Sequence, residues 1–214
     1  MHLRWRFAQF FERIWWRQYL RKKNIKNYLH WKKNYWNAFL GKTGVNLSAG
    51  CHILDAGCGP AGIFSVLTDA RVDALDPLLE RYESELPYFD RADFPQVRFY
   101  ALPLESFQPE SPYDVVFCLN VINHVDDIDR CLDRLVAILN PGGHLVLSVD
   151  AHKRDWLQRL FQWVPADILH PHQHTRMQYE KMLTQRQMVL KRSAVLKKGR
   201  IFDYCLLVAT RWAE

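Results

Sequence analysis

The sequence predicts an α/β domain with a mostly parallel seven-stranded sheet, a C-terminal antiparallel β-hairpin and an N-terminal helical arm. Three observations support this fold class. From Cys51 onward, short apolar runs alternate with amphipathic stretches, which is typical of β-α-β units with right-handed crossovers. The first apolar run ends in a glycine-rich turn. The last two β-rich runs flank Lys197-Lys198-Gly199, which indicates a hairpin turn with positive φ at the glycine.

The boundaries of the elements follow from apolar periodicity and from turn residues. Strands are expected over residues 52–55, 72–75, 97–101, 114–119, 144–149, 188–196 and 201–210. Helices are expected over residues 61–69, 77–86, 128–139, 156–163 and 177–187. The first 40 residues contain no Pro or Gly and are expected to be helical. Asn140-Pro141-Gly142-Gly143 is a strong signal for the end of a helix.

Charge divides the chain into an arm and a body. The net charge is +6, but residues 1–44 hold 11 Lys and Arg against one acid, Glu12, whereas the rest holds 18 basic and 22 acidic residues. We therefore expect a basic aromatic arm or lid over residues 1–46 and one main domain over residues 47–214. Residues 151–187 are expected to form a helical insertion that faces the substrate.

The arm admits several interpretations. Tyr28, Tyr35 and Trp36 are expected to fold over the glycine turn and complete a substrate pocket. Alternatively, the lysines and interleaved aromatics bind nucleic acid by phosphate contact and stacking, or the arm lies on an anionic membrane surface. A simple amphipathic helix, with its aromatics in the core and its cations in solvent, is the remaining interpretation. A lid with a solvated basic face is favoured because so many exposed aromatic side chains are rare on soluble proteins.

Composition excludes several classes of protein. A chain of 214 residues with 49% hydrophobic residues suits one folded domain. The five cysteines are scattered and form no Cys-x-x-Cys pair, which indicates free, mostly buried thiols with no disulfide framework or zinc site. No apolar run approaches the ~20 residues of a membrane span, and the N-terminus lacks the apolar core of a signal peptide. A cytoplasmic protein without a resident metal is therefore expected.

A glycine motif carries the main functional signal. Gly57, Gly59 and Gly62 satisfy G-x-G-x-x-G between an expected strand and an expected helix, which is a Rossmann-like nucleotide-binding pattern. Asp76 ends the next strand, where its carboxylate can accept hydrogen bonds from both hydroxyls of a ribose. Asp55, two residues before the first glycine, would repel a dinucleotide diphosphate but can hold a methionine ammonium, directly or through water. This combination favours S-adenosylmethionine over NAD.

Residues 52–150 resemble a class I S-adenosylmethionine-dependent methyltransferase of the ubiquinone/menaquinone-methyltransferase-like group. The resemblance covers about half of the chain and rests, beside the glycine motif and Asp76, on three runs: Tyr113-Asp114-Val115-Val116, Asn120-Val121-Ile122-Asn123-His124-Val125 and Leu139-Asn140-Pro141-Gly142-Gly143-His144-Leu145. It implies that S-adenosylmethionine is the cofactor and S-adenosylhomocysteine the product. The expected cofactor contacts are Asp55, Gly57, Cys58, Gly59, Asp76, Pro77, Leu104, Glu105 and Asn120.

One departure from the family concerns the adenine. Many relatives carry Gly-Asp-Ala after the third strand, but this chain reads Tyr100-Ala101-Leu102-Pro103-Leu104-Glu105. Leu102 and Pro103 can supply only backbone and apolar contact to the adenine. Glu105 is the candidate that replaces the missing aspartate.

Histidines are the candidate catalytic residues. His124 follows the fourth strand and is expected at the cofactor mouth as a general base or substrate partner; a loop or helix-cap histidine is the other interpretation. His170, His172 and His174 alternate along a Pro-containing segment and point to a substrate site, a metal site or a structural loop. His152 ends the fifth strand and is a weaker candidate for substrate contact.

These features predict transfer of a methyl group to an oxygen or nitrogen, and less readily a carbon, of a small molecule. Two rival functions remain open: an RNA methyltransferase that uses the basic arm, and a noncatalytic S-adenosylmethionine-binding protein. The run Asn120-Val121-Ile122-Asn123 lacks the Asn-Pro-Pro-Tyr pattern of methylases that act on exocyclic amines of nucleic acids. That difference favours a small methyl acceptor over a nucleic acid.

Overall fold

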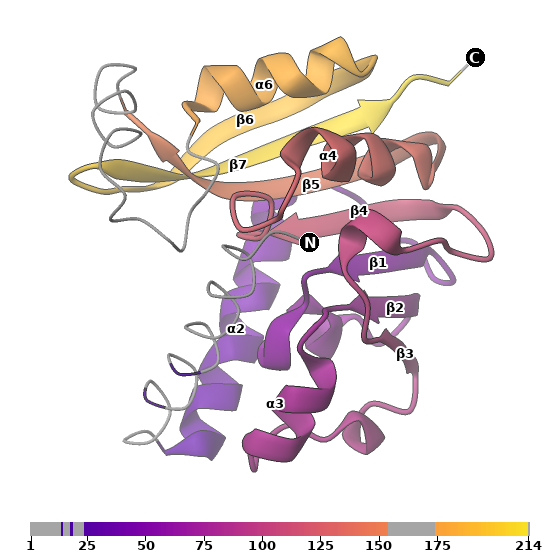
Figure 1. Ribbon diagram of the computed structural model, residues 1–214, viewed down its shortest axis with the longest axis vertical. Coiled ribbons are helices and arrows are strands. Elements are labelled where there is room, and N and C mark those ends of the chain that lie inside the picture. The colour runs from indigo at the N-terminus through magenta and orange to yellow at the C-terminus, as the bar shows by residue number, and fades with distance from the viewer. Residues whose placement is uncertain (1–13, 15–17, 19–23, 154–173, 214) are drawn as a thin grey trace.

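The computed structural model describes residues 14, 18, 24–153 and 174–213 (Figure 1). Its centre is a seven-stranded sheet in the order β3-β2-β1-β4-β5-β7-β6. The strands are β1 (His52–Ala56), β2 (Arg71–Leu75), β3 (Val97–Tyr100), β4 (Tyr113–Leu119), β5 (Leu139–His152), β6 (Met188–Lys198) and β7 (Phe202–Arg211). β1 to β5 run parallel, whereas β7 pairs antiparallel with both β5 and β6. The expected fold class, including the antiparallel C-terminal hairpin, is confirmed.

The strand order reverses beside β1. The chain moves from β1 to β2 to β3 in one direction and then returns to place β4 against the other side of β1. In an open parallel sheet, such a reversal leaves a crevice at the carboxyl ends of the two central strands. The glycine turn follows the carboxyl end of β1, so the fold places this motif at the crevice.

Helices cover both faces of the sheet. α4 (Ile128–Ala137) and α6 (Arg176–Gln185) bury Leu132 and Leu183 against one face, together with Leu145 and Leu147 of β5. α2 (Ile25–Thr43) packs on the other face, where Phe39 meets the buried cluster that holds Phe117, and the short helix α3 (Leu79–Glu85) contributes to the same cluster. Figure 1 shows α4 and α6 on one side of the β5–β7 strands.

The expected long N-terminal helix is interrupted. Asn24 has an extended backbone (φ −69°, ψ 114°), and its side chain accepts a hydrogen bond from the Asn27 amide at 3.1 Å, which caps α2. Residues 14 and 18 are also helical, whereas the expected helix over residues 156–163 lies outside the described residues. Asparagine competes well for backbone donors, so it begins a new helix where the surrounding composition suggested a continuous one.

The segment after the glycine motif is not the expected α-helix. Residues Gly59–Ala61 and Ile63–Val66 form two short 3-10 turns, η1 and η2, because the backbone of Gly62 between them is extended (φ −74°, ψ 179°). A Cβ at residue 62 would lie 2.4 Å from the Asp55 carboxylate and from the Cys58 carbonyl. The close approach of Asp55 therefore requires glycine here and prevents a regular helix.

Two further boundaries differ from the expectation. α4 ends at Ala137, shortly before residues 140–143, but these residues belong to β5, where the five-residue step from Leu139 to His144 faces only the two-residue step from Tyr113 to Val115 in β4. The Pro-Gly-Gly run is therefore a bulge within the strand. At the hairpin turn, Gly199 does not adopt positive φ; a Cβ there would lie 2.1 Å from the Phe202 carbonyl oxygen, so close approach explains the glycine.

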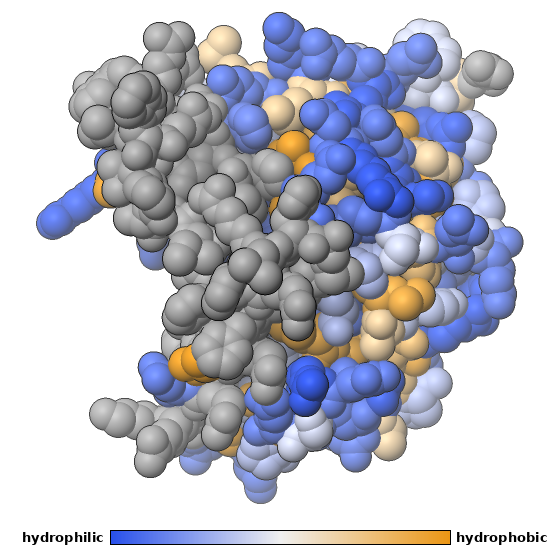
Figure 2. All heavy atoms as spheres, viewed as in Figure 1, coloured by the Kyte–Doolittle hydropathy of each residue, from blue (hydrophilic) through white to orange (hydrophobic). Residues whose placement is uncertain are grey.

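The described surface is mainly polar. In the view of Figure 2, hydrophilic side chains predominate over the described part, and apolar side chains occur in small separate areas. All five cysteines are free thiols and four of them are buried, as expected. Among the described residues, no helix has the length and apolarity to cross a membrane.

Candidate cofactor and substrate site

The glycine turn is tied to the neighbouring strand and loop. The amides of Gly57 and Cys58 donate to the Leu75 carbonyl at 2.6 and 3.0 Å. Gly57 has φ of 76°, and a Cβ on it would lie 2.3 Å from a methyl group of Val121 in the loop after β4. Only glycine meets both demands, so the chain can turn sharply between β1 and the Val121 loop.

Asp76 clamps the glycine turn. One of its carboxylate oxygens accepts a hydrogen bond from the Gly59 amide at 3.0 Å, and the other accepts one from the Leu78 amide at 2.8 Å. Its own amide donates to the Tyr100 carbonyl of β3. The carboxylate is thus fixed beside the turn, at the end of β2, where the sequence predicts the ribose contact.

Asp55 lies buried beneath the turn and caps η2. Its Oδ2 accepts a hydrogen bond from the Phe64 amide at 3.1 Å. Burial raises the pKa of this carboxyl to about 7, although the Phe64 and Ile63 amides and the charge of Lys32 oppose the rise. The carboxylate is therefore desolvated and favours a cationic partner.

The charge of Lys32 on α2 acts on Asp55, and sequence analysis did not select this lysine. Its ammonium lies 4.9 Å from the ring centre of Trp36 and 5.6 Å from that of Tyr35, both on α2. Burial lowers the pKa of Lys32 to about 8, and the nearby Asp55 charge opposes this change. Lys32 was expected to be solvated, and no pattern in the sequence distinguished it from the other lysines of α2.

Cys58 occupies the turn as a neutral thiol. It is buried, and burial, followed by the charges of Asp76 and Asp55, raises its pKa well above the ordinary value for a thiol. A thiol of this kind packs and does not act as a nucleophile.

The candidate adenine contacts are separated by the structure. Leu102 is 44% exposed beside the end of β3, whereas Leu104 is buried in the core. Glu105 accepts a hydrogen bond from the Asp126 amide at 3.1 Å, so its carboxylate already holds the loop before α4. Pro77 is half-buried after Asp76. Leu102 offers the apolar surface that the sequence analysis expected at this place.

The loop after β4 begins in a strained conformation. Asn120 is exposed and has φ of 60°, a region that asparagine tolerates better than most residues. Its amide donates to the Ser148 carbonyl of β5 at 2.8 Å. His124 follows in a turn closed by its amide and the Val121 carbonyl, and its side chain is half-buried.

The arm aromatics have different roles. Tyr28 and Trp36 are buried, and the Trp36 indole N–H donates to the Ala61 carbonyl of η1 at 2.9 Å. α2 therefore packs directly on the glycine-turn segment, as a lid would. Tyr35 is only half-buried, and its hydroxyl donates to that of Tyr204 in β7 at 3.4 Å.

Beside His152, the end of β5 holds two polar residues that the sequence analysis did not select, Ser148 and Asp150. Ser148 and His152 are buried, and Asp150 lies between them on the same face of the strand. The available signal was that Ser148, in the expected strand, and Asp150, just after it, alternate with apolar residues. His152 packs its ring 4.4 Å from that of Phe202, and its amide donates to the His174 carbonyl.

Of the histidine run, only His174 can be placed. It lies edge-on to Tyr179 with ring centres 5.4 Å apart, beside the N-terminus of α6. His170 and His172 lie outside the described residues, so their expected roles stay predictions.

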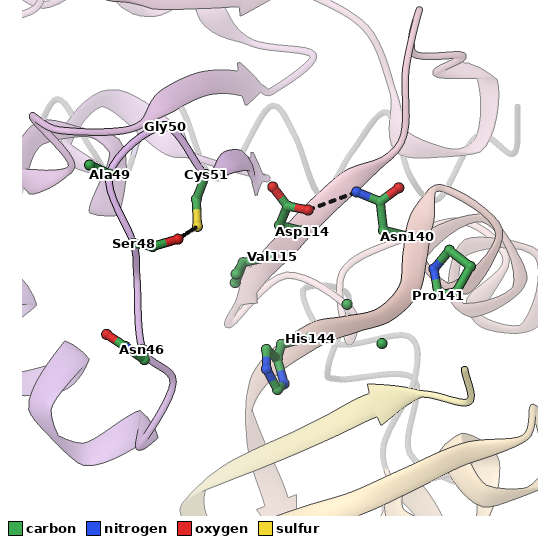
Figure 3. A pocket seen from close by; sticks show the side chains of 12 residues that line it. Asn46, Ser48, Ala49, Gly50, Cys51, Asp114, Val115, Asn140, Pro141 and His144 are labelled. Carbon is green, nitrogen blue, oxygen red and sulfur yellow. Dashed lines mark hydrogen bonds between the residues drawn. The ribbon is translucent and has the colours of Figure 1, made fainter. Parts of the chain in front are cut away.

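A separate pocket opens at the opposite ends of the strands, away from the glycine turn. It has a volume of about 430 Å³ and is lined at the amino ends of β1, β4 and β5 by residues that include Cys51, Asp114 and His144 (Figure 3). Asp114 is already engaged, because its carboxylate accepts hydrogen bonds from Asn140 and from the His52 amide. The pocket lies away from the glycine turn and from Asp76, which are at the carboxyl ends.

Fold and site together define a Rossmann-like domain with a glycine turn after β1 and an aspartate, Asp76, after β2. A family model described as "Methyltransferase domain" matches residues 11–188. The chain belongs to this methyltransferase family, as the resemblance implied.

Two curated relatives show which methyltransferases the sequence resembles. A ubiquinone biosynthesis O-methyltransferase of Rickettsia typhi is 29% identical over 124 residues, which are 54% of this chain and 50% of the relative. The Rickettsia felis protein of the same name is 27% identical over 164 residues, covering 71% of this chain and 64% of the relative. The chain thus spans about half to two thirds of the length of these relatives.

Solved structures share the fold. A Burkholderia thailandensis 1,6-didemethyltoxoflavin-N1-methyltransferase superposes with a TM-score of 0.59 at 18% identity, covering 86% of this chain and 78% of that one. A Haemonchus contortus phosphoethanolamine N-methyltransferase 2 gives 0.63 at 14% identity, covering 84% and 52%. The [4+2]-cyclase SpnF gives 0.66 at 11% identity, covering 85% and 81%. Because proteins with such different reactions share this fold, the chemistry has to be argued from the site.

Proposed function

We propose that this protein transfers the methyl group of S-adenosylmethionine to a hydroxyl oxygen of a small molecule. The family match and the names of the curated relatives support methyl transfer to oxygen. Transfer to nitrogen is the second choice, because structural neighbours include N-methyltransferases. Transfer to carbon is the least favoured.

The pair of Asp55 and Lys32 carries the cofactor assignment. A carboxylate and an ammonium, both desolvated and close enough to shift each other's pKa, are complementary to the ammonium and carboxylate of an amino acid. S-adenosylmethionine has such a zwitterionic end, whereas NAD has a diphosphate that Asp55 would repel. Asp76 would then accept the ribose hydroxyls, and Leu102 would pack on the adenine.

Methyl transfer is an in-line displacement. The bond between the methyl carbon and the sulfonium sulfur breaks as the carbon–oxygen bond forms, and the sulfonium becomes a neutral thioether. The hydroxyl proton passes to a base or to water. Because the leaving group is good, the protein contributes mainly by alignment and exclusion of water. His124, half-buried after β4, is the proposed proton acceptor on the described part of the chain, and His170 and His172 remain proposed alternatives.

The proposed substrate contacts lie between α2 and the end of β5. Tyr35 and His152 reach this region, and Trp36 and His174 border it. Tyr28, the remaining proposed contact, packs farther along α2 against Ala61 and Tyr88. We also propose a cytoplasmic location, which the five free thiols favour.

Calorimetric titration tests the proposal. The wild-type protein should bind S-adenosylmethionine and S-adenosylhomocysteine and not NAD, and Asp76→Ala should lose that binding. Asp69→Ala, which removes an exposed carboxylate, is the matched control and should bind normally. Labelled S-adenosylmethionine should then transfer methyl to hydroxylated small molecules. Binding without transfer to any acceptor would favour a noncatalytic binding protein, and NAD binding would overturn the cofactor assignment.

A further inference from the structure

The face of β5 that looks toward α2 changes from apolar to polar along the strand. Val146 packs in the cluster that contains Phe39 of α2. Side chains two residues apart share a face, so Ser148, Asp150 and His152 continue the line of Val146. The alternate residues, such as Leu147, pack in the cluster of α4 and α6. The polar residues thus lie where the apolar layer beneath α2 ends.

At this end of the apolar layer, three hydroxyl groups form a hydrogen-bonded chain. Tyr204 lies opposite Asp150 in the β5–β7 register, and its hydroxyl donates to Ser148 Oγ at 2.8 Å. Tyr35 of α2 donates to the Tyr204 oxygen at 3.4 Å, which is at the long end of hydrogen-bond distances. The inner bond is therefore firm, whereas the outer bond can give way to another donor.

The chain of hydroxyls lies beside the loop after β4. Ser148 pairs with Leu119 at the end of β4, and its carbonyl accepts the Asn120 amide at 2.8 Å. In the next strand pair, Phe117 of β4 lies opposite Asp55 of β1. The hydroxyls therefore lie, like Asp55, toward the carboxyl ends of the parallel strands. They are on the β5 side of β1, whereas Asp76 and β2 are on the other side.

We propose that Tyr204 orients the hydroxyl of the methyl acceptor and that Ser148 positions Tyr204 for this purpose. The proposal rests on the proposed function. Because Tyr204 donates its proton to Ser148, its oxygen can only accept. A methyl-acceptor hydroxyl that displaces Tyr35 and donates a hydrogen bond to this fixed oxygen turns its lone pairs toward the methyl group. As the carbon–oxygen bond forms, the hydroxyl proton leaves Tyr204 for the proposed base His124 or for water, because Tyr204 itself stays protonated.

The surroundings of Tyr204 favour a role in orienting the substrate hydroxyl over a role as proton acceptor. Burial, followed by the neighbouring Tyr35, raises the pKa of Tyr204 above its ordinary range, so its phenol stays protonated. Ser148 is fully buried and cannot meet the methyl acceptor itself. Ser148 acts only through Tyr204.

The test uses 4-nitrocatechol, whose visible absorbance reports its ionisation, bound to the full chain saturated with S-adenosylhomocysteine. Wild type should bind the probe, and Tyr204→Phe should bind it about five- to tenfold more weakly, as expected for one lost hydrogen bond. Tyr88→Phe is the matched control: the Tyr88 hydroxyl is buried with no hydrogen-bond partner among the described residues, so its loss should leave probe binding unchanged.

A second readout separates orientation from simple packing. In Ser148→Ala the Tyr204 proton is released to point at the probe, which stabilises the phenolate, so the bound probe should ionise at lower pH than in wild type. Ser148→Thr keeps the hydroxyl and should restore the wild-type titration, and Tyr204→Phe should abolish the response to Ser148→Ala.

Three outcomes would overturn the proposal: wild type with bound S-adenosylhomocysteine fails to bind the probe, Tyr204→Phe binds it as tightly as wild type, or Ser148→Ala leaves the titration unmoved. A wild-type protein that does not bind S-adenosylhomocysteine would instead contradict the proposed function.

Discussion

Asp55 is a buried carboxyl whose proposed ligand, an ammonium group, requires it to be ionised. Since the pKa of Asp55 is about 7 and a bound cation lowers it, affinity for S-adenosylhomocysteine should fall as pH falls below 7, approaching about tenfold per pH unit. Asp55→Asn should bind weakly at every pH and lose this dependence. Calorimetry between pH 5.5 and 8.5 measures both, and a pH-independent wild-type affinity would remove Asp55 from the cofactor site.

The same carboxyl affects folding in the opposite direction. Because its pKa is raised in the folded state, its contribution to stability is present below its ordinary pKa near 4 and is lost as pH rises through about 7. Asparagine is neutral throughout and can still accept the Phe64 amide. Asp55→Asn should therefore raise the melting temperature more at pH 8 than at pH 5. Asp69→Asn, at an exposed position, should show no such difference.

Tyr88 offers a stability prediction of a simpler kind. Its hydroxyl is buried, has no hydrogen-bond partner among the described residues, and lies near Tyr28 with ring centres 6.5 Å apart. A buried polar group without a partner costs about 1–3 kcal/mol, so Tyr88→Phe should raise the free energy of unfolding by about 1 kcal/mol. Chemical denaturation measures the change. A loss of stability would show that the hydroxyl has a partner, such as a bound water.

At the scale of single residues, the sequence identified those site residues whose positions a motif determines. Asp55, Gly57 and Asp76 lie together because strand ends and glycine spacing determine where they go. Lys32 and Tyr204 were missed for a physical reason. One lies in a helix among other lysines and the other in an apolar strand, and only tertiary packing brings them to the site.

At the scale of elements, α2 is joined to the glycine-turn segment by one buried hydrogen bond, from Trp36 to the Ala61 carbonyl. Trp36→Phe keeps most of the apolar contact but removes the donor, which should cost about 1–3 kcal/mol of unfolding free energy. It should also weaken binding of S-adenosylhomocysteine, because the turn is held less firmly. Trp31→Phe, at a side chain that is 51% exposed, is the control and should change neither quantity. Unaltered cofactor binding in Trp36→Phe would argue against α2 as a lid.

Two glycines test the reasons given for their positions. Gly199→Ala should destabilise the hairpin, since the new methyl group would lie 2.1 Å from the Phe202 carbonyl oxygen. Gly41 lies within α2 with no atom within 4 Å of an added Cβ, so Gly41→Ala should stabilise by about 0.5–1 kcal/mol through helix propensity. Thermal melts should show a lower melting temperature for Gly199→Ala and a higher one for Gly41→Ala. Equal effects would mean that the hairpin relaxes around the added group.

The elements themselves were predictable where periodicity and breakers agree. All seven strands were expected, whereas the sequence did not predict that β4 returns to the other side of β1 or that β7 lies between β5 and β6. The errors occur where a side chain competes with local propensity: Asp55 reshapes the segment after the glycine turn into η1 and η2, and Asn24 divides the arm. Contacts of this kind depend on residues distant in the sequence or on a single cap, which composition does not reveal.

For the whole molecule, the open choice between a small substrate and RNA concerns the basic arm. Removal of residues 1–44 would not test it cleanly, because Trp36 and Phe39 belong to the core. Lys26, Lys33 and Lys42 are exposed on α2, so their replacement together by glutamine removes charge without touching the core. This triple variant separates the arm's charge from its packing.

A small-molecule enzyme should bind S-adenosylhomocysteine equally well with and without these lysines. An RNA-binding enzyme should lose affinity for a short single-stranded RNA in the variant. Each phosphate contact adds about 0.7 to the slope of log affinity against log salt, so loss of three contacts should reduce the slope by about 2. Filter binding across a salt series measures this slope. We expect no steep slope for wild type and no change in the variant, since α2 packs Trp36 and Phe39 into the core and the charge of Lys32 acts on Asp55 within the fold. A steep wild-type slope that the variant reduces would show that the basic arm binds RNA.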